Sequence, residues 1–84
     1  MEEERLGFVG IVIDDRASVK AVNEILSCYA SMIRGRLGVP DPQSGEAVIG
    51  LIVRGDNNRI GAMTGRLGNL PGVRVKSALT ASKA

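Results

Sequence analysis

The sequence lacks histidine and tryptophan, and Cys28 is its one cysteine. Without histidine, the chain has neither the commonest general base nor the commonest ligand of transition metals. One cysteine cannot form an internal disulfide, which fits a reducing cytoplasm. We therefore expect no catalytic residues, no metal or other cofactor, and a cytoplasmic protein. Cys28 is predicted at the exposed edge of a helix, where a surface thiol without a role is a plainer interpretation than a redox or metal thiol.

Aromatic side chains and long apolar runs are equally scarce. Phe8 and Tyr29 are the aromatic residues, and no apolar run approaches the roughly 20 residues of a membrane span. The net charge is +2, from eleven basic and nine acidic residues. This mild charge and the few aromatics argue against direct nucleic-acid binding, and we expect no membrane contact. The length predicts a single domain over residues 1–84, with loose tails at 1–5 and 80–84.

Four segments have residue patterns typical of β-strands. Leu6–Ile13 and Ala47–Arg54 are apolar at successive positions, which is typical of strands buried on both sides. Ile33–Val39 and Val73–Leu79 alternate apolar with basic residues, which is typical of strands with one exposed face. The first pair is therefore predicted at the centre of a sheet and the second pair at its edges.

Two helices separate these strands. The first is predicted at about Arg16–Met32, with Asp15 as its N-cap and an apolar stripe formed by Val19, Val22, Leu26, Tyr29 and Ile33. The second starts at residues 55–58 and ends at Gly68, with the stripe Ile60, Met63 and Leu67. The order β-α-β-β-α-β predicts an α+β, ferredoxin-like sandwich with strand order 4-1-3-2 and both helices on one face.

The face without helices is predicted to combine an apolar strip with basic rims. Alternation places Ile33, Leu37 and Val39 toward the helices. It places four basic residues on the open face: Arg34, Arg36, Arg74 and Lys76. Such a face serves either association or anion binding. Because a core of this size is thin, we expect a homo-oligomer that uses the open face or the edge strand, with interface residues Ile33, Gly35, Leu37 and Val39.

Two further segments allow a functional and a plain interpretation. Asp14, Asp15 and Arg16 form a charged turn before a helix, which either hosts an anionic ligand on the free amides or caps the helix. Gly61 and Gly65 lie one turn apart, which either permits close approach of another group or reflects a helix of low propensity.

The chain also resembles a known family. The resemblance rests on Val9–Arg16, Val22–Leu26, Ile33–Pro40, Leu67–Val73 and Lys76–Leu79, of which Gly-Arg-Leu-Gly-Val-Pro and Leu-Gly-Asn-Leu-Pro-Gly-Val are the more specific blocks. These segments are similar to the small stand-alone iron-only hydrogenase system regulators. Those are ACT-like domains, similar to the C-terminal domain of the nickel-responsive repressor.

The resemblance implies a regulatory domain that forms dimers or tetramers and binds a small effector at subunit interfaces, near the first strand–helix loop. The candidate ligand-binding residues are then Asp14, Asp15, Arg16, Arg34, Arg36 and Asn69. Nickel sensing does not transfer, because the nickel-binding relatives use histidines that this chain lacks. The DNA-binding segment of those repressors is absent too, so regulation would need a partner protein or a direct effect on an enzyme.

Two other classes of function stay open at this point. One is a structural or protein-interaction module of an enzyme assembly, which would bind no ligand. The other is a nucleic-acid binder or an enzyme without a recognisable motif. A shift in melting temperature on adding a ligand would favour the effector-binding oligomer, and salt-dependent retention on nucleic acid would favour the last class.

Overall fold

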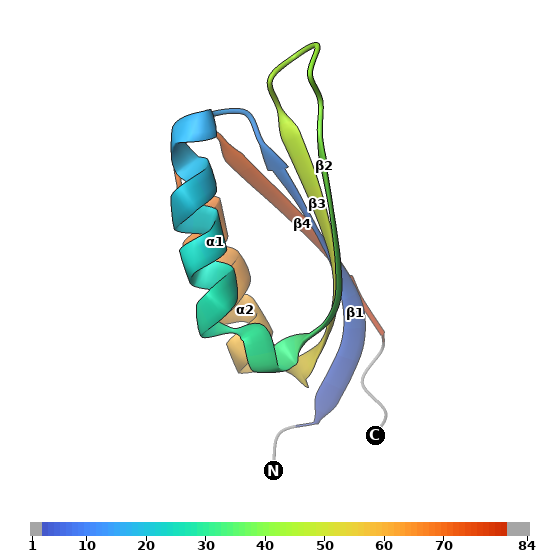
Figure 1. Ribbon diagram of the computed structural model, residues 1–84. Helices are drawn as coiled ribbons and strands as arrows, with labels where there is room; N and C mark the ends of the chain where they lie inside the picture. The colour runs from blue at the N-terminus through green and yellow to red at the C-terminus, as the bar shows by residue number, and fades with distance from the viewer. Residues whose placement is uncertain (1–2, 81–84) are drawn as a thin grey trace.

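A computed structural model describes residues 3–80, and Figure 1 shows one sheet with two helices side by side on one of its faces. The elements are β1 (Glu4–Ile13), η1 (Arg16–Ser18), α1 (Val19–Cys28), η2 (Ala30–Met32), β2 (Ile33–Pro40), β3 (Ala47–Asp56), α2 (Asn57–Gly68) and β4 (Val73–Leu79). None of the helices in this part of the chain combines the length and apolar character that crossing a membrane requires.

The sheet has the order β2-β3-β1-β4, which confirms the predicted 4-1-3-2 order of a ferredoxin-like fold. All three strand pairs are antiparallel. The two all-apolar strands, β1 and β3, are central, and the two strands with basic residues are edges. The apolar pattern predicted this arrangement, because a central strand is shielded by a neighbouring strand on each side and by the helices on one face. The helix-facing residues of β1 and β3 are buried, whereas their alternate residues lie on the open face.

The core lies between the sheet and the two helices. From the central strands it takes Val9, Ile11, Ile13, Ile49, Leu51 and Val53, and from the helices Val22, Ile25, Leu26, Ile60, Met63 and Leu67. The predicted stripe of α2 is confirmed, while Ile25 is a core residue of α1 that the predicted stripe omitted. Cys28 is exposed, as predicted.

Some element boundaries differ from the prediction. The helix expected over Arg16–Met32 is divided into η1, α1 and η2, because Tyr29 leaves the helical conformation with φ −114° and ψ 22°. The first strand begins at Glu4 rather than Leu6, so Glu4 and Arg5 pair with β3 instead of belonging to a loose tail. The predicted tail positions 1–2 and 81–84 lie outside the described residues.

The predicted orientation of β2 is wrong, and a β-bulge is the reason. Ile33 pairs with Val53, but Gly35 pairs with Ile52, so the register shifts by one residue between them. Such a shift moves every following side chain to the other face. Arg36 therefore points toward the helices, where its Nη2 donates to Asn23 Oδ1 at 2.6 Å. Arg34, at the bulge, donates from Nη1 to the Ser31 carbonyl at 3.0 Å.

The same shift brings Leu37 and Val39 to the open face instead of the core. Since directly opposed residues share a face, they join side chains from β1 and β3 there. Together these residues form what we call the open-face patch, and they are all of the exposed large apolar side chains among residues 3–80: Leu6, Phe8, Leu37, Val39, Val48 and Ile52. Arg74 and Lys76 lie on this face as predicted, opposite Val12 and Gly10.

A pair of opposed glycines shapes the centre of the open-face patch. Gly10 and Gly50 face each other across β1 and β3, and the Phe8 ring covers both. A Cβ at Gly50 would lie 3.0 Å from the ring, and one at Gly10 would lie 3.1 Å from it. The aromatic ring can lie flat on the strands only because neither position carries a side chain.

Candidate functional site

The strand ends beside the first strand–helix connection enclose a cavity. Ile13, the last residue of β1, pairs with Ala47, and Ala47 also pairs with Pro40 at the end of β2. The cavity has a volume of about 380 Å³, and its lining residues are Ile13, Arg16, Val19, Pro40, Gly45, Glu46 and Ala47. We call it the loop cavity. Its size lies within the range typical of small-molecule sites.

The walls of the loop cavity are mainly apolar, with one cationic and one anionic side chain among them. Arg16 comes from η1, and Glu46 immediately precedes β3. Apolar walls with a few charged groups are the usual composition of sites that hold small ligands, because the walls supply affinity and the charges fix orientation.

A group of three charged side chains stands next to the cavity. Arg74 Nη2 lies 3.2 Å from Asp14 Oδ1 and 3.9 Å from Glu46 Oε2. A hydrogen bond between the two carboxyl groups lowers the pKa of Asp14, and Arg74 lowers it further. The same hydrogen bond raises the pKa of Glu46. As the pH falls, Glu46 therefore takes up a proton before Asp14 does.

The connection from β1 to α1 is held by local hydrogen bonds. Asp15 Oδ1 accepts from the Ala17 amide at 2.9 Å, which confirms Asp15 as a cap, though of η1 rather than of α1 itself. The Asp14 amide donates to the Gly72 carbonyl at 2.7 Å, and Ser18 Oγ donates to the Pro71 carbonyl at 2.6 Å. These hydrogen bonds tie the connection to Pro71 and Gly72, which precede β4.

The structure brings together only part of the predicted ligand-binding set. Arg16 lines the loop cavity and Asp14 stands beside it, while the Asp15 carboxylate is used as a cap. Arg34 and Arg36 lie toward the opposite end of the sheet, because β2 starts next to Val53, far along β3 from Ala47. Asn69 is the exposed C-cap of α2 and is outside the lining of the cavity.

Glu46, Val19 and Arg74 were not predicted at this site. A usable signal existed for Glu46. Strands β1 and β3 were predicted as neighbours, and antiparallel pairing brings the end of one to the start of the other. The position of Arg74 beside Asp14 depends on the register of β4 against β1, and sequence patterns do not supply that register. Within residues 3–80 no cluster of three or more His, Cys, Asp or Glu side chains could hold a metal ion.

The chain is similar to solved structures of several kinds. It is 36% identical to the uncharacterized protein TM1266 from Thermotoga maritima, with 94% of this chain and 100% of that one covered and a TM-score of 0.89. A formyltetrahydrofolate deformylase from Pseudomonas putida is 16% identical, with 92% of this chain and 29% of that one covered and a TM-score of 0.62. At this identity the likeness shows the fold alone.

A nitrogen regulatory PII-like protein from Thiomonas intermedia, CPII, also shares the fold. Its structure with bound ADP, AMP and acetate is 12% identical, with 95% of this chain and 93% of that one covered and a TM-score of 0.52. No protein with a curated description matches the sequence. The likeness to the nickel-responsive repressor stays a prediction.

The family comparison covers most of the chain. Residues 5–77 match the family described as TM1266-like, with the proposed role of iron-only hydrogenase system regulator. This range contains both helices and all four strands, except the first residue of β1 and the last two of β4. It also contains every residue that lines the loop cavity. The chain therefore belongs to the TM1266-like family of iron-only hydrogenase system regulators.

Proposed function

We propose that the protein is a non-catalytic regulatory domain that self-associates through its open-face patch and binds a small effector in the loop cavity. The observation that carries the proposal is the position of the cavity beside the patch. Val39 and Val48 belong to the patch, and their chain neighbours Pro40 and Ala47 line the cavity. An effector that shifts the ends of β2 and β3 therefore changes both surfaces together.

The cost of leaving the patch in water supports self-association. Leu37 is 70% exposed, and the other members are between 43% and 56% exposed. Burying a side chain of this kind contributes about 1.5–3 kcal/mol. Contiguous apolar patches on one face usually mark a contact with another molecule. If the patch is buried only in the oligomer, a ligand that favours the associated form acts on assembly by mass action.

Effector binding is tested first by native mass spectrometry of the protein purified from its own cells. We expect a small molecule to be retained by the wild type and lost from Arg16→Ala, because Arg16 is the cation of the loop cavity. Lys20→Ala removes a cation from α1, outside the lining, and is the matched control. A wild type without any retained molecule, and without a melting shift when small metabolites are added, would leave the protein an interaction module instead.

Self-association is tested separately by sedimentation at micromolar concentration. Ile52→Glu places a charge in the open-face patch without touching the core, so we expect a folded protein that has lost this contact and sediments with a lower mass than the wild type. Ser27→Glu adds the same charge on exposed α1 and should leave the mass unchanged. A wild type that sediments as an 8.8 kDa species at both low and high salt would overturn this half of the proposal.

A further inference from the structure

The two edges of the sheet differ in how they are protected from further pairing. The β2 edge has the bulge between Ile33 and Gly35 and ends in Pro40. Bulges and prolines are the usual devices that stop an edge from adding another strand. The β4 edge has neither device. Its residues Val73–Leu79 pair with β1 in an unbroken register, which leaves a regular outer edge.

The hydrogen bonds at the two ends of β4 show which of its backbone groups face outward. The Asp14 amide donates to the Gly72 carbonyl at 2.7 Å, and the Thr80 amide donates to the Leu6 carbonyl at 2.9 Å. In an antiparallel pair, residues alternate between facing the partner strand and facing away. The even-numbered residues of β4 therefore direct their backbone N–H and C=O groups toward β1. The backbone groups of Val75, Ser77 and Leu79 point outward.

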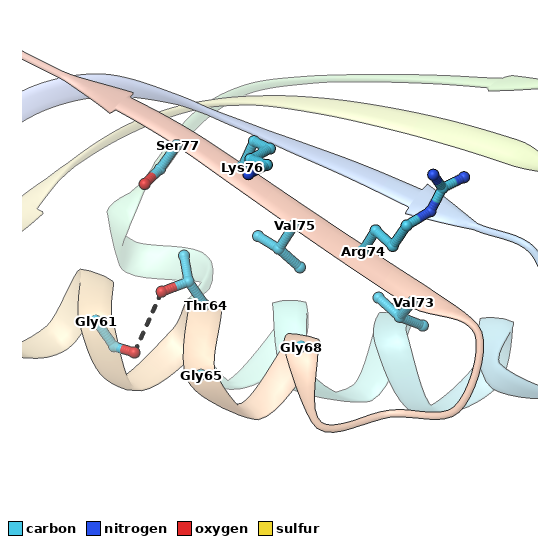
Figure 2. A pocket seen from close by; sticks show the side chains of 9 residues that line it. All are labelled: Gly61, Thr64, Gly65, Gly68, Val73, Arg74, Val75, Lys76 and Ser77. Carbon is cyan, nitrogen blue, oxygen red and sulfur yellow. Dashed lines mark hydrogen bonds between the residues drawn. The ribbon is translucent and has the colours of Figure 1, made fainter.

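A hollow runs along this free edge. Figure 2 shows the residues that line it, which come from β4 and the helix α2. Its volume is about 620 Å³, and its lining is Gly61, Thr64, Gly65, Gly68, Val73, Arg74, Val75, Lys76 and Ser77. A Cβ on Gly61, Gly65 or Gly68 would meet nothing within 4 Å. Each glycine costs a helix about 1 kcal/mol relative to alanine. The protomer by itself gives no packing reason for these glycines.

We propose that β4 pairs with β4 of a second copy of this chain, antiparallel about a two-fold axis at Ser77, and that the glycine face of α2 packs against its counterpart. Neighbouring strands lie about 4.8 Å apart, and α2 contacts β4 most, with further contacts to β1 and β3. A two-fold axis beside β4 therefore places the two α2 helices about 10 Å apart. This is the spacing of packed helices, and small residues permit it.

The charges of β4 select this register. With Ser77 opposite Ser77 of the second copy, Val75 lies opposite Leu79, and Lys76 lies opposite Ala78. Shifting the axis to Lys76 would put two lysines directly opposite each other, which is destabilising. Shifting it to Val75 would pair Arg74 with Lys76. The Ser77 register is thus the one that pairs outward backbone groups and separates like charges.

The proposed edge contact deepens the self-association proposed above, because it names a second contact of the same oligomer. The open-face patch and the β4 edge are different surfaces, so each copy can use both at once. Two different two-fold contacts whose axes cross at right angles generate a closed tetramer, which is a dimer of dimers. The sheet would then run through eight strands across the edge contact, with β2 at both outer ends.

Cross-linking tests the register. In a Cys28→Ser background, Ser77→Cys places two thiols opposite each other with their Cα atoms about 5.5 Å apart, which a disulfide spans. We expect a covalent dimer when diamide is added. Ser27→Cys in the same background is the matched control, since Ser27 is an exposed serine of α1, and it should remain monomeric on a denaturing gel.

Filling the hollow tests the contact without altering the edge. Gly65→Leu points its side chain into open space in the protomer, so the chain should fold, but the leucine occupies the place of the second α2. We expect the sedimentation mass to fall by half, from tetramer to the dimer formed through the open-face patch. Ser27→Leu adds the same side chain to exposed α1 and should keep the tetramer.

Two results would overturn the edge contact while leaving the proposed function intact. One is a Ser77→Cys protein that cross-links no more than Ser27→Cys. The other is a Gly65→Leu protein with the wild-type mass, together with an Ile52→Glu protein that is a monomer rather than the dimer expected from the β4 contact. Either result would mean that the β4 edge does not pair with a second copy. The edge would then be covered by another molecule, such as an extended segment of a different protein, or it would be exposed to water. A monomeric wild type would instead overturn both proposals.

Discussion

The two faces of the sheet are built from the same strands and the same kinds of residues, but they have different exposures. On β3, Leu51 is fully buried under the helices, while its chain neighbour Ile52 is 44% exposed on the other face. On β1, Val9 is buried and Phe8 is 47% exposed. A protomer that needed only its own core could carry polar residues on the open face. The open face instead combines Arg74 and Lys76 with large apolar side chains, so one face forms the core of the protomer and the other is the surface that we propose for self-association.

The largest expected effect on the free energy of unfolding comes from truncating Leu51 and Ile52, one at a time. Leu51→Ala should lower the free energy of unfolding by about 2–5 kcal/mol, because it leaves a cavity in the core. Ile52→Ala should cost much less when the protein is dilute, and more as its concentration rises, because its burial depends on assembly. Urea unfolding at several protein concentrations measures both. Equal costs at all concentrations would remove the distinction between the faces.

A glycine on each face sharpens the comparison. A Cβ at Gly55 would lie against the sulfur of buried Met32, so Gly55→Ala should overpack the core and cost about 1–3 kcal/mol. A Cβ at Gly50 would meet only Phe8, whose exposed ring can move away. Gly50→Ala should therefore change thermal unfolding less than Gly55→Ala. The reverse ranking would show that the Phe8 ring is as fixed as a core side chain.

The bulge in β2 predicts a smaller effect at Arg36. Arg36→Ala removes the 2.6 Å hydrogen bond to Asn23 on α1, and we expect a loss of about 0.5–1.5 kcal/mol. Asn23→Ala should cost a similar amount, and the double variant should cost less than the sum of the two. Strict additivity in denaturant unfolding would mean that the two side chains do not interact, and that Arg36 faces the open side after all.

The smallest expected effect is a pH dependence at the loop cavity. The lowered pKa of Asp14 stabilises the folded state above the ordinary value of 3.8, and this contribution is lost as the pH falls. The raised pKa of Glu46 acts the other way, because the folded state then binds the proton more tightly. That contribution is present below the ordinary value of 4.5 and is lost as the pH rises through the raised pKa.

Glu46→Gln keeps a hydrogen-bond donor for Asp14 at every pH. The melting temperature of this variant should therefore fall less than that of the wild type as the pH rises through the raised pKa of Glu46. Glu24→Gln, on exposed α1, should leave the wild-type profile unchanged. A Glu46→Gln profile that matches the wild type in this range would show that the two carboxyl groups do not share a proton.

Sequence patterns predicted the elements, the strand order and the burial of the helix-facing side of the central strands, since these depend on apolar periodicity over many residues. The burial predicted for their other side is not seen in the protomer, where Phe8 and Ile52 are exposed. The orientation of Leu37 and Val39 depends on one extra residue at the bulge, and no local signal marks it, because Gly35 and Gly38 tolerate either register. The candidate site was found in part. Asp14 and Arg16 follow from their place after a strand, whereas Arg74 required the pairing of segments 60 residues apart.

The bulge also constrains how relatives of this chain can gain or lose residues. A deletion at Arg34 would remove the extra residue and leave every later pairing of β2 unchanged. A deletion at Gly38 has a different outcome, because straightening the bulge then restores the pairing of Val39 and Pro40. It would turn Arg36 outward and Leu37 inward. Loss of one codon at Arg34 would therefore keep the apolar open face, whereas loss of one codon at Gly38 would replace an apolar side chain on that face with a charged one.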